Sequence, residues 1–324
     1  MDASDRDLLA RSLRQATERH SGPALDRALD DLGWPDALAD DPRAAISTLF
    51  ELQGATGSTS SALDQVLVHA LDLPTALVTP PTPSVVLPAV GTWERPGTFD
   101  GDRLDVAGLA DAALAAGPLA LVLASSESSD VAVTVPTHAL ELRPVEGIDP
   151  DLGLVEVAGG RLQPDGVQLI PAPAWPAAVA RARLALSHQL VGAARHMLEL
   201  ARTHALERVQ FGRPIGSFQA VRHRLAETLV AIETAEAVID AAWLDGSVGT
   251  AAMAKAVSGR EARTAARHCQ QVLAGIGFTT EHPLHRYVRR VMVLDGLFGT
   301  SRSLTSALGD ELLRTRKLPP LLPL

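Results

Sequence analysis

Apolar residues recur at spacings of three and four along the first part of the chain, which is the pattern of helices with one buried face. The pattern runs from Ser4 to about Leu73 and breaks over residues 54–59, where Gly, Ser and Thr are frequent. The positions that share a face are Leu8, Leu9, Leu13 and Ala16, then Leu25, Leu29 and Leu32, then Ala45, Leu49 and Leu52. We therefore predict an N-terminal helical domain over residues 1–73.

The pattern changes at Pro74, after which prolines are frequent and short β-branched runs replace the helical spacing. Turn signals such as Asp100-Gly101 and Glu146-Gly147 separate these runs. The runs are Val85–Leu87, Leu119–Leu123, Val131–Val135 and Leu154–Val157. This arrangement predicts a small β domain over residues 74–173.

Helical spacing returns after Pro173. In the first long helix one apolar face contains Leu190, Ala194, Met197, Leu198, Ala201 and Ala205. We expect a second helix with Ser217 as its N-cap, a third over about Ala251–Leu273, and a fourth after Thr280 with Pro283 in its first turn. Residues 174–324 are thus predicted to form a four-helix bundle, and the whole chain an α+β protein that is mostly α.

The composition of the chain excludes several classes of function. The formal net charge is -9, with 29 Lys and Arg against 38 Asp and Glu, which argues against binding to nucleic acid. Cys269 is the single cysteine, so disulfides and cysteine-based metal sites are excluded, and the histidines show no metal-ligand spacing. No apolar run approaches the roughly 20 residues of a membrane-spanning helix. We expect a soluble, cytoplasmic protein without a metal.

Two stretches of the C-terminal half contain polar or charged side chains together with glycines. Residues 208–216, Arg-Val-Gln-Phe-Gly-Arg-Pro-Ile-Gly, connect two long helices, and an ordinary loop with surface arginines would fit them equally well. Residues 271–278, Gln-Val-Leu-Ala-Gly-Ile-Gly-Phe, end the third helix with small residues, where a pyrophosphate could approach bare backbone N–H groups. Each stretch alone is a weak signal, because glycine often ends a helix.

Together the stretches over residues 207–220 and 271–281, with Gly299-Thr300, resemble the acyl-CoA dehydrogenase family. The resemblance is strong over the C-terminal domain, and the earlier domains match in order and rough size. It implies that FAD is held between two subunits, with an arginine, a phenylalanine and two glutamines coming from the neighbouring subunit. The implied cofactor-binding residues here are Arg208, Phe211, Gln219 and Gln271, together with Gln210, Ile215, Ala274 and Gly275.

The family reaction needs a carboxylate that removes the α-proton of an acyl thioester while the β-hydride goes to the flavin. The family's usual position for that glutamate is Phe298 in this chain, and the second position used by some members is Ala182, just before Arg183. Neither side chain can accept a proton. In the middle domain the family's Thr-Glu-Pro-Gly segment is reduced to Thr79-Pro80-Pro81, and its Trp-Ile-Thr to residues 111–113, Asp-Ala-Ala.

Our leading hypothesis is a subunit of a heteromeric, FAD-dependent acyl-CoA dehydrogenase, inactive by itself. A paralogous partner, in an α2β2 assembly, would supply the catalytic glutamate. This is similar to the short subunit of the heterotetrameric dehydrogenases of bacterial steroid side-chain breakdown, which suggests a steroid or other polycyclic acyl-CoA substrate.

Two alternatives stay open. In the first, the chain is a self-sufficient homomeric dehydrogenase with a displaced base, and Asp295 is the best candidate, ahead of Glu261, although a helical carboxylate is usually a solvated surface group. In the second, it is a non-enzymatic scaffold or acyl-CoA binder that has kept the fold.

Overall fold

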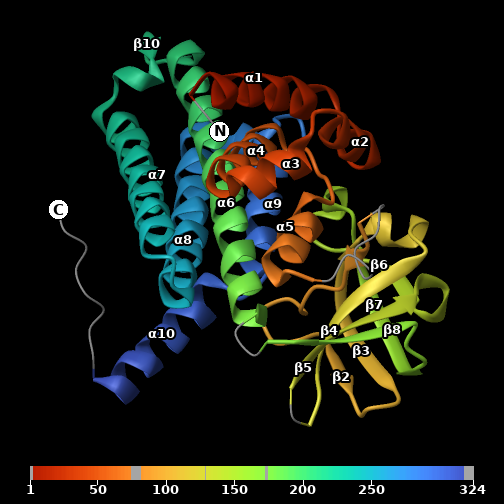
Figure 1. The fold of residues 1–324 in the computed structure, drawn as a ribbon. Helices are drawn as coiled ribbons and strands as arrows, with labels where there is room; N and C mark the ends of the chain where they lie inside the picture. Colours follow the sequence, from red (N-terminus) through yellow and green to blue (C-terminus); the bar gives the residue numbers. More distant parts are fainter. Residues whose placement is uncertain (1–2, 74–81, 128, 172–173, 317–324) are drawn as a thin grey trace. The chain divides into compact units, whose positions relative to one another are not determined.

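The computed structural model describes residues 3–73, 82–127, 129–171 and 174–316, and Figure 1 shows their helices and strands. The described chain is mostly helical. In chain order, five helices come first, the strands of one large sheet follow, and further helices complete the chain, so the predicted α+β class is confirmed. It forms two compact units. Unit 1 contains Met1–Ile46, Ser58–Ala182 and Leu297–Gly299, and unit 2 contains Ser47–Gly57, Arg183–Gly296 and Thr300–Leu324. The division into domains 1–73, 74–173 and 174–324 remains a prediction.

The N-terminal segment is helical, as its spacing predicts. The helices are α1 (Ala3–Arg19), α2 (Pro23–Asp31), α3 (Trp34–Asp40), α4 (Pro42–Thr56) and α5 (Ala62–Leu71). Most of the expected apolar positions are buried, among them Leu13, Leu25 and Leu29. The expectation was wrong for Leu8, which is 60% exposed near the start of α1, and for Leu32, which follows the end of α2 and is 39% exposed.

The sheet lies in unit 1. Its strands are β1 (Ser84–Val85), β2 (Gly97–Phe99), β3 (Leu104–Asp111), β4 (Leu119–Ser125), β5 (Asp130–Pro136), β6 (Glu141–Pro144), β7 (Leu154–Leu162) and β8 (Gly166–Ile170). The order is β6-β7-β3-β2-β4-β5-β8, with β1 paired to β4. The central strands β4 and β5 are buried on both faces, which is why they are continuous apolar runs. Three of the four predicted runs lie within β4, β5 and β7, and the run over residues 85–87 overlaps β1 at Val85 alone. Strands β2, β3, β6 and β8 were not predicted.

The segment aligned with the family's Trp-Ile-Thr has a local structural role. Asp111 ends β3, and its Oδ1 accepts a hydrogen bond from Ala113 N at 2.8 Å, at the start of the 3-10 helix η2 (Ala112–Ala116). The family's other segment, assigned to Thr79-Pro80-Pro81, lies outside the described residues.

Asp64 on α5 is a buried carboxyl group, 4% exposed, and its Oδ2 has no hydrogen-bond partner in the described structure. Burial raises the pKa of Asp64 well above its usual value, and the nearby Asp111 raises it further, while a backbone hydrogen bond from Val85 acts in the opposite direction. Because the folded chain holds this proton more tightly than the unfolded chain, stability is lost as the pH rises from the unfolded pKa through the folded one.

We therefore expect Asp64→Asn to raise the free energy of unfolding at pH 8 by roughly 1–3 kcal/mol, because the amide keeps the shape and cannot ionise. At pH 4, where the native carboxyl is protonated, the gain should vanish. Urea unfolding at the two pH values measures the difference. An equal gain at both would show that ionisation of Asp64 is not the cause.

Helix α6 (Ala174–Glu207) begins in unit 1 and continues through unit 2. Its residues 182–194 are all buried, so the single apolar face expected from the sequence is wrong for this stretch. The end of α4 packs backbone to backbone on it. A Cβ added to Gly54 would lie 2.1 Å from Gln189 O, and one added to Gly192 would lie 2.0 Å from Glu51 O. These two glycines permit the close helix crossing.

Unit 2 continues with β9 (Val209–Gln210), β10 (Arg213–Pro214), η5 (Ile215–Ser217), α7 (Gln219–Asp245), α8 (Val248–Leu273), η6 (Ala274–Phe278), α9 (Leu284–Gly296) and α10 (Ser301–Thr315). Two expected helix starts were wrong. Phe218, not Ser217, precedes α7, and the Ser217 hydroxyl donates to Pro214 O instead. Pro283 was expected in the first turn of the fourth helix, but it stands just before α9. Helix α10 is a further helix after the four that were predicted.

Candidate functional site

The first motif forms a short hairpin between α6 and α7. Strands β9 and β10 pair Gln210 with Arg213 and Val209 with Pro214. Arg208 N donates to His204 O at the end of α6, and Ile215 N donates to Arg208 O at 2.8 Å, which closes the hairpin at its base. The two residues at the tip are Phe211 and Gly212.

Phe211 has a φ of 54° and Gly212 a φ of 75°, the left-handed conformations that a two-residue hairpin turn requires. A bulky residue rarely adopts such a φ, and at this tip Phe211 is 92% exposed. The rings of Phe211 and Phe218 meet edge to face, with centroids 6.1 Å apart and an angle of 85° between the planes. The guanidinium carbon of Arg213 lies 4.2 Å from the Phe218 ring centroid.

Helices α7 and α8 are joined by a short turn at Gly246 and run antiparallel, so the start of α7 and the end of α8 lie at the same end of the pair (Figure 1). Side-chain contacts fix this register, because Arg224 Nη1 and Thr228 Oγ1 of α7 both lie 3.1 Å from ring nitrogens of His268 on α8. Gln219 precedes these residues on α7 and Gln271 follows them on α8. The fold thus places both predicted glutamines at one end of the helix pair.

The second motif provides bare backbone at that same end. Ala274, which ends α8, has φ 52° and ψ -134°, a conformation that glycine adopts more easily than alanine. A Cβ added to Gly275 would meet nothing within 4 Å, so the backbone there is open to a ligand. The chain thus has a strained backbone at the end of α8, where we expect a pyrophosphate to approach.

The predicted cofactor-binding residues are all at the surface of unit 2. Ile215 is half-buried, and the exposed ones are Arg208, Gln210, Phe211, Gln219, Gln271, Ala274 and Gly275. They supply one cation, three amide side chains, an exposed aromatic ring and exposed backbone at Ala274-Gly275. This donor set suits a dinucleotide with an anionic pyrophosphate and flat ring systems.

The two base positions differ sharply from this surface. Phe298 is 1% exposed and Ala182 is 0% exposed, both within unit 1. The Phe298 ring packs on Trp175, with centroids 6.5 Å apart, and Trp175 Nε1 donates to Trp93 O at 3.1 Å. Phe298 has a φ of 54°, another rare backbone conformation for a bulky residue. An aromatic core therefore fills the position that the resemblance assigns to the family's glutamate.

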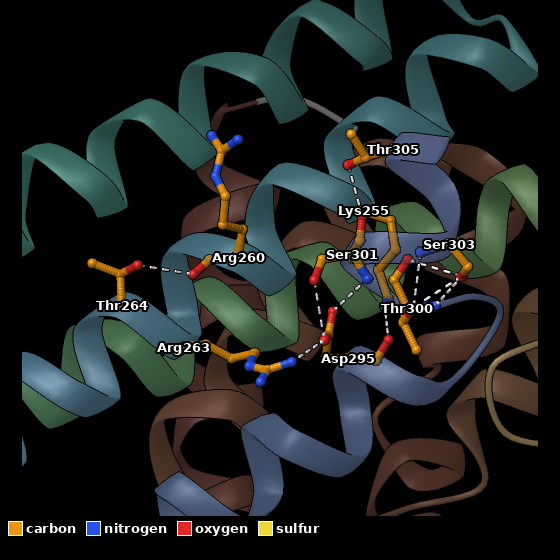
Figure 2. A network of polar contacts seen from close by, with 9 residues as sticks. All are labelled: Lys255, Arg260, Arg263, Thr264, Asp295, Thr300, Ser301, Ser303 and Thr305. Atoms are coloured by element: carbon orange, nitrogen blue, oxygen red, sulfur yellow. Dashed lines mark hydrogen bonds and ion pairs between the residues drawn. The ribbon is translucent and has the colours of Figure 1, made fainter. Parts of the chain in front are cut away.

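Asp295, the candidate for a displaced base, is 2% exposed, so the view of it as a solvated surface carboxylate was wrong. Figure 2 shows its carboxylate held between α8 and the start of α10. Ser301 N donates to Oδ1 at 2.9 Å, while Ser301 Oγ and Arg263 Nη1 each donate to Oδ2 at 3.2 Å. A Cβ on Gly259 would lie 2.0 Å from Oδ1, so the carboxylate also packs on the helix backbone. These contacts indicate a structural role.

Lys255 is buried beside Asp295, at 0% exposure, and its Nζ donates to the main-chain oxygen of Asp295 at 3.0 Å. Burial lowers the pKa of Lys255 to about 8, although the attraction of Asp295 raises it. The lysine thus puts a cation at the carboxyl-terminal end of α9, where it is stabilised by the helix dipole and by the Asp295 carboxylate. Sequence reasoning missed this buried pair.

Two other reactive side chains have structural or surface contacts. Cys269 is buried, and burial raises the pKa of its thiol to about 12, so it is a packing residue rather than a nucleophile. Glu261 pairs with Arg260 at 2.7 Å. Across the described ranges no group of three or more His, Cys, Asp or Glu could hold a metal ion.

The part of the chain that the structure describes contains no helix that is both long and apolar enough to cross a membrane.

Residues 176–313 match the family described as acyl-CoA dehydrogenase, C-terminal domain. The whole chain is similar to acyl-CoA dehydrogenase IpdE2 of Mycobacterium tuberculosis, with 28% identity over 95% of this chain and 97% of that protein. It is 43% identical to acyl-CoA dehydrogenase FadE34 of the same organism, over 36% of this chain and only 17% of FadE34.

Two solved structures share the fold over almost their full length. One is a variant of the steroid ACAD Tcur3481-Tcur3483, with a TM-score of 0.80 and 21% identity over 97% of this chain and 99% of that chain. The other is the ChsE4-ChsE5 complex from Mycobacterium tuberculosis, with a TM-score of 0.77 and 18% identity over 99% of both chains.

Proposed function

We propose that this chain is one subunit of a heteromeric, FAD-dependent acyl-CoA dehydrogenase, because residues 176–313 match the C-terminal domain of that family and the whole chain is similar to one acyl-CoA dehydrogenase. In this proposal it gives flavin contacts to a site whose catalytic glutamate comes from a paralogous partner in an α2β2 assembly. The assembly desaturates an acyl-CoA thioester between its α and β carbons.

One contrast carries the proposal. The residues that match the family's contacts to a neighbouring subunit's flavin are at the surface of unit 2, while both base positions are buried and apolar. A chain that acts on its own substrate needs an accessible carboxylate, and neither Phe298 nor Ala182 can replace it. A chain that completes a partner's site needs the surface contacts alone.

The names of similar proteins support a heteromeric enzyme and a bulky substrate. IpdE2 is named an acyl-CoA dehydrogenase. The ChsE4-ChsE5 structure is named as a complex, and its name joins two different chains. Tcur3481-Tcur3483 is named a steroid ACAD. A steroid or similar polycyclic thioester is therefore the substrate class we propose, with the reducing cytoplasm as the location, which a single buried cysteine suits.

Each surface residue has a distinct role in this proposal. The Arg208 guanidinium pairs with a pyrophosphate oxygen, and Gln219 and Gln271 donate and accept hydrogen bonds at the adenosine or phosphate groups. Gln210 and Ile215 line the same hairpin, Phe211 packs on the flat ring system, and the backbone of Ala274-Gly275 approaches the phosphates. The bound flavin would supply the chemistry of hydride acceptance.

We expect Arg208→Ala to weaken FAD binding by the assembled enzyme by about 2 kcal/mol, or roughly thirtyfold in Kd, because one charge-assisted pair with the pyrophosphate is lost. Titration of FAD into the flavin-stripped complex measures this. Arg202→Ala is the matched control, since Arg202 is an exposed arginine of α6 that pairs with Glu199. Equal affinity of the Arg208→Ala and native complexes would reject the proposed contact.

A further inference from the structure

We propose that Phe218 is a positioning residue that holds the exposed Phe211 ring in the orientation in which it receives the flavin. This inference rests on the proposed function, because it takes the flavin contact of Phe211 from there. The motif comparison gives Phe218 no role of its own, and the geometry of the hairpin assigns one.

The hairpin by itself holds Phe211 weakly. It contains two residue pairs, Gln210 with Arg213 and Val209 with Pro214, and short two-stranded hairpins are marginally stable in water. The ring at its tip is 92% exposed, so little of the surrounding protein restrains it. Within the described residues, its ring contacts one other aromatic ring, that of Phe218, edge to face.

Phe218 is itself fixed from several sides. Its backbone N donates to Ile215 O at 3.0 Å, and its carbonyl accepts from Arg222 N at 3.1 Å in the first turn of α7. The Arg213 guanidinium stacks on its ring, and Arg213 belongs to the returning strand of the same hairpin. Phe218 thus joins the hairpin tip, the returning strand and the rigid helix α7.

Such a contact matters most before the ligand binds. An aromatic pair contributes about 0.5–1.5 kcal/mol beyond its buried area, and a side chain that is already ordered loses less entropy on binding. Removing the Phe218 ring would let Phe211 sample other rotamers while leaving the helices intact. Flavin affinity would fall although no flavin contact of Phe211 had been deleted.

A double-mutant cycle on the assembled complex tests this, with FAD titrated into the flavin-stripped protein. Phe218→Leu keeps apolar volume and loses the ring, and we expect it to weaken FAD binding roughly three- to tenfold. Phe218→Tyr keeps the ring and should restore native affinity. In the Phe211→Ala background, Phe218→Leu should have no further effect, because its action passes through Phe211.

The outcomes separate this inference from the proposed function. If Phe211→Ala weakens FAD binding but Phe218→Leu does not, the positioning role is wrong and the shared flavin site stands. If the two substitutions weaken binding additively, Phe218 acts independently of Phe211 and the inference is also wrong. If neither Phe211→Ala nor Arg208→Ala changes FAD affinity, the proposed function itself fails. Equal thermal unfolding of Phe218→Leu and Phe218→Tyr confirms that affinity is compared on folded chains.

Discussion

A glutamate in place of Phe298 is expected to lower the free energy of unfolding by about 4 kcal/mol, and it should not make the isolated chain an enzyme. The substitution removes a ring that is 1% exposed and packs on Trp175, and it puts a carboxyl group into the same apolar surroundings. Burial disfavours the ionised form of such a group, so it would be a poor proton acceptor at neutral pH. Urea unfolding and an acyl-CoA oxidation assay measure the two effects.

Phe298→Leu is the matched control, because it shortens the side chain without adding a polar group. It should cost clearly less than Phe298→Glu, since the difference between them is mainly the buried carboxyl. A Phe298→Glu chain that folds as well as the native one and oxidises an acyl-CoA by itself would show that the position is an open base site.

The second large effect is expected at Asp295. Asp295→Ala should lower the free energy of unfolding by about 3 kcal/mol, because it removes the acceptor of the Ser301 bonds and the counter-charge of the buried Lys255. The bridge to Arg263 adds little, since that arginine is 54% exposed and screened by water. Chemical denaturation at pH 7 gives the value.

Two further variants interpret that result. Asp310→Ala, at an exposed aspartate of α10, should change stability by no more than about 0.5 kcal/mol. Asp295→Asn keeps the shape and should cost less than Asp295→Ala. If Asp295→Asn abolished turnover of the complex while stability and bound flavin were unchanged, Asp295 would be the displaced base and its structural role would be secondary.

The helices could be predicted because their apolar residues recur with a helical period, and the central strands β4 and β5 because they are continuous apolar runs. Strand β3 was harder, because Gly108 interrupts its alternation. The structure shows the reason for that glycine, since a Cβ there would lie 2.3 Å from Leu87 O. Strand β8 alternates between half-buried and exposed residues and leaves Val167 and Leu169 exposed, so its apolar residues do not mark a buried face.

Some features of the candidate site could also be predicted from the sequence, and others could not. The motif residues were found by resemblance, and the structure places the two glutamines at one end of the α7–α8 pair. The contacts of Phe218 with Arg213 and Phe211 depend on a turn with two positive φ values. The sequence Phe211-Gly212 does not reveal that turn. Lys255 stands among alanines on a buried face of α8, and a lysine in such an apolar run indicates a buried cation with a partner.

The direct test of a shared flavin site is the number of flavins per chain, counted by absorbance for the isolated chain and for the chain co-expressed and purified with an acyl-CoA dehydrogenase-like partner. We predict a colourless isolated chain without activity, and a yellow, active complex that contains fewer flavins than chains. An isolated chain that is yellow, carries one flavin per chain and oxidises an acyl-CoA would contradict the proposal.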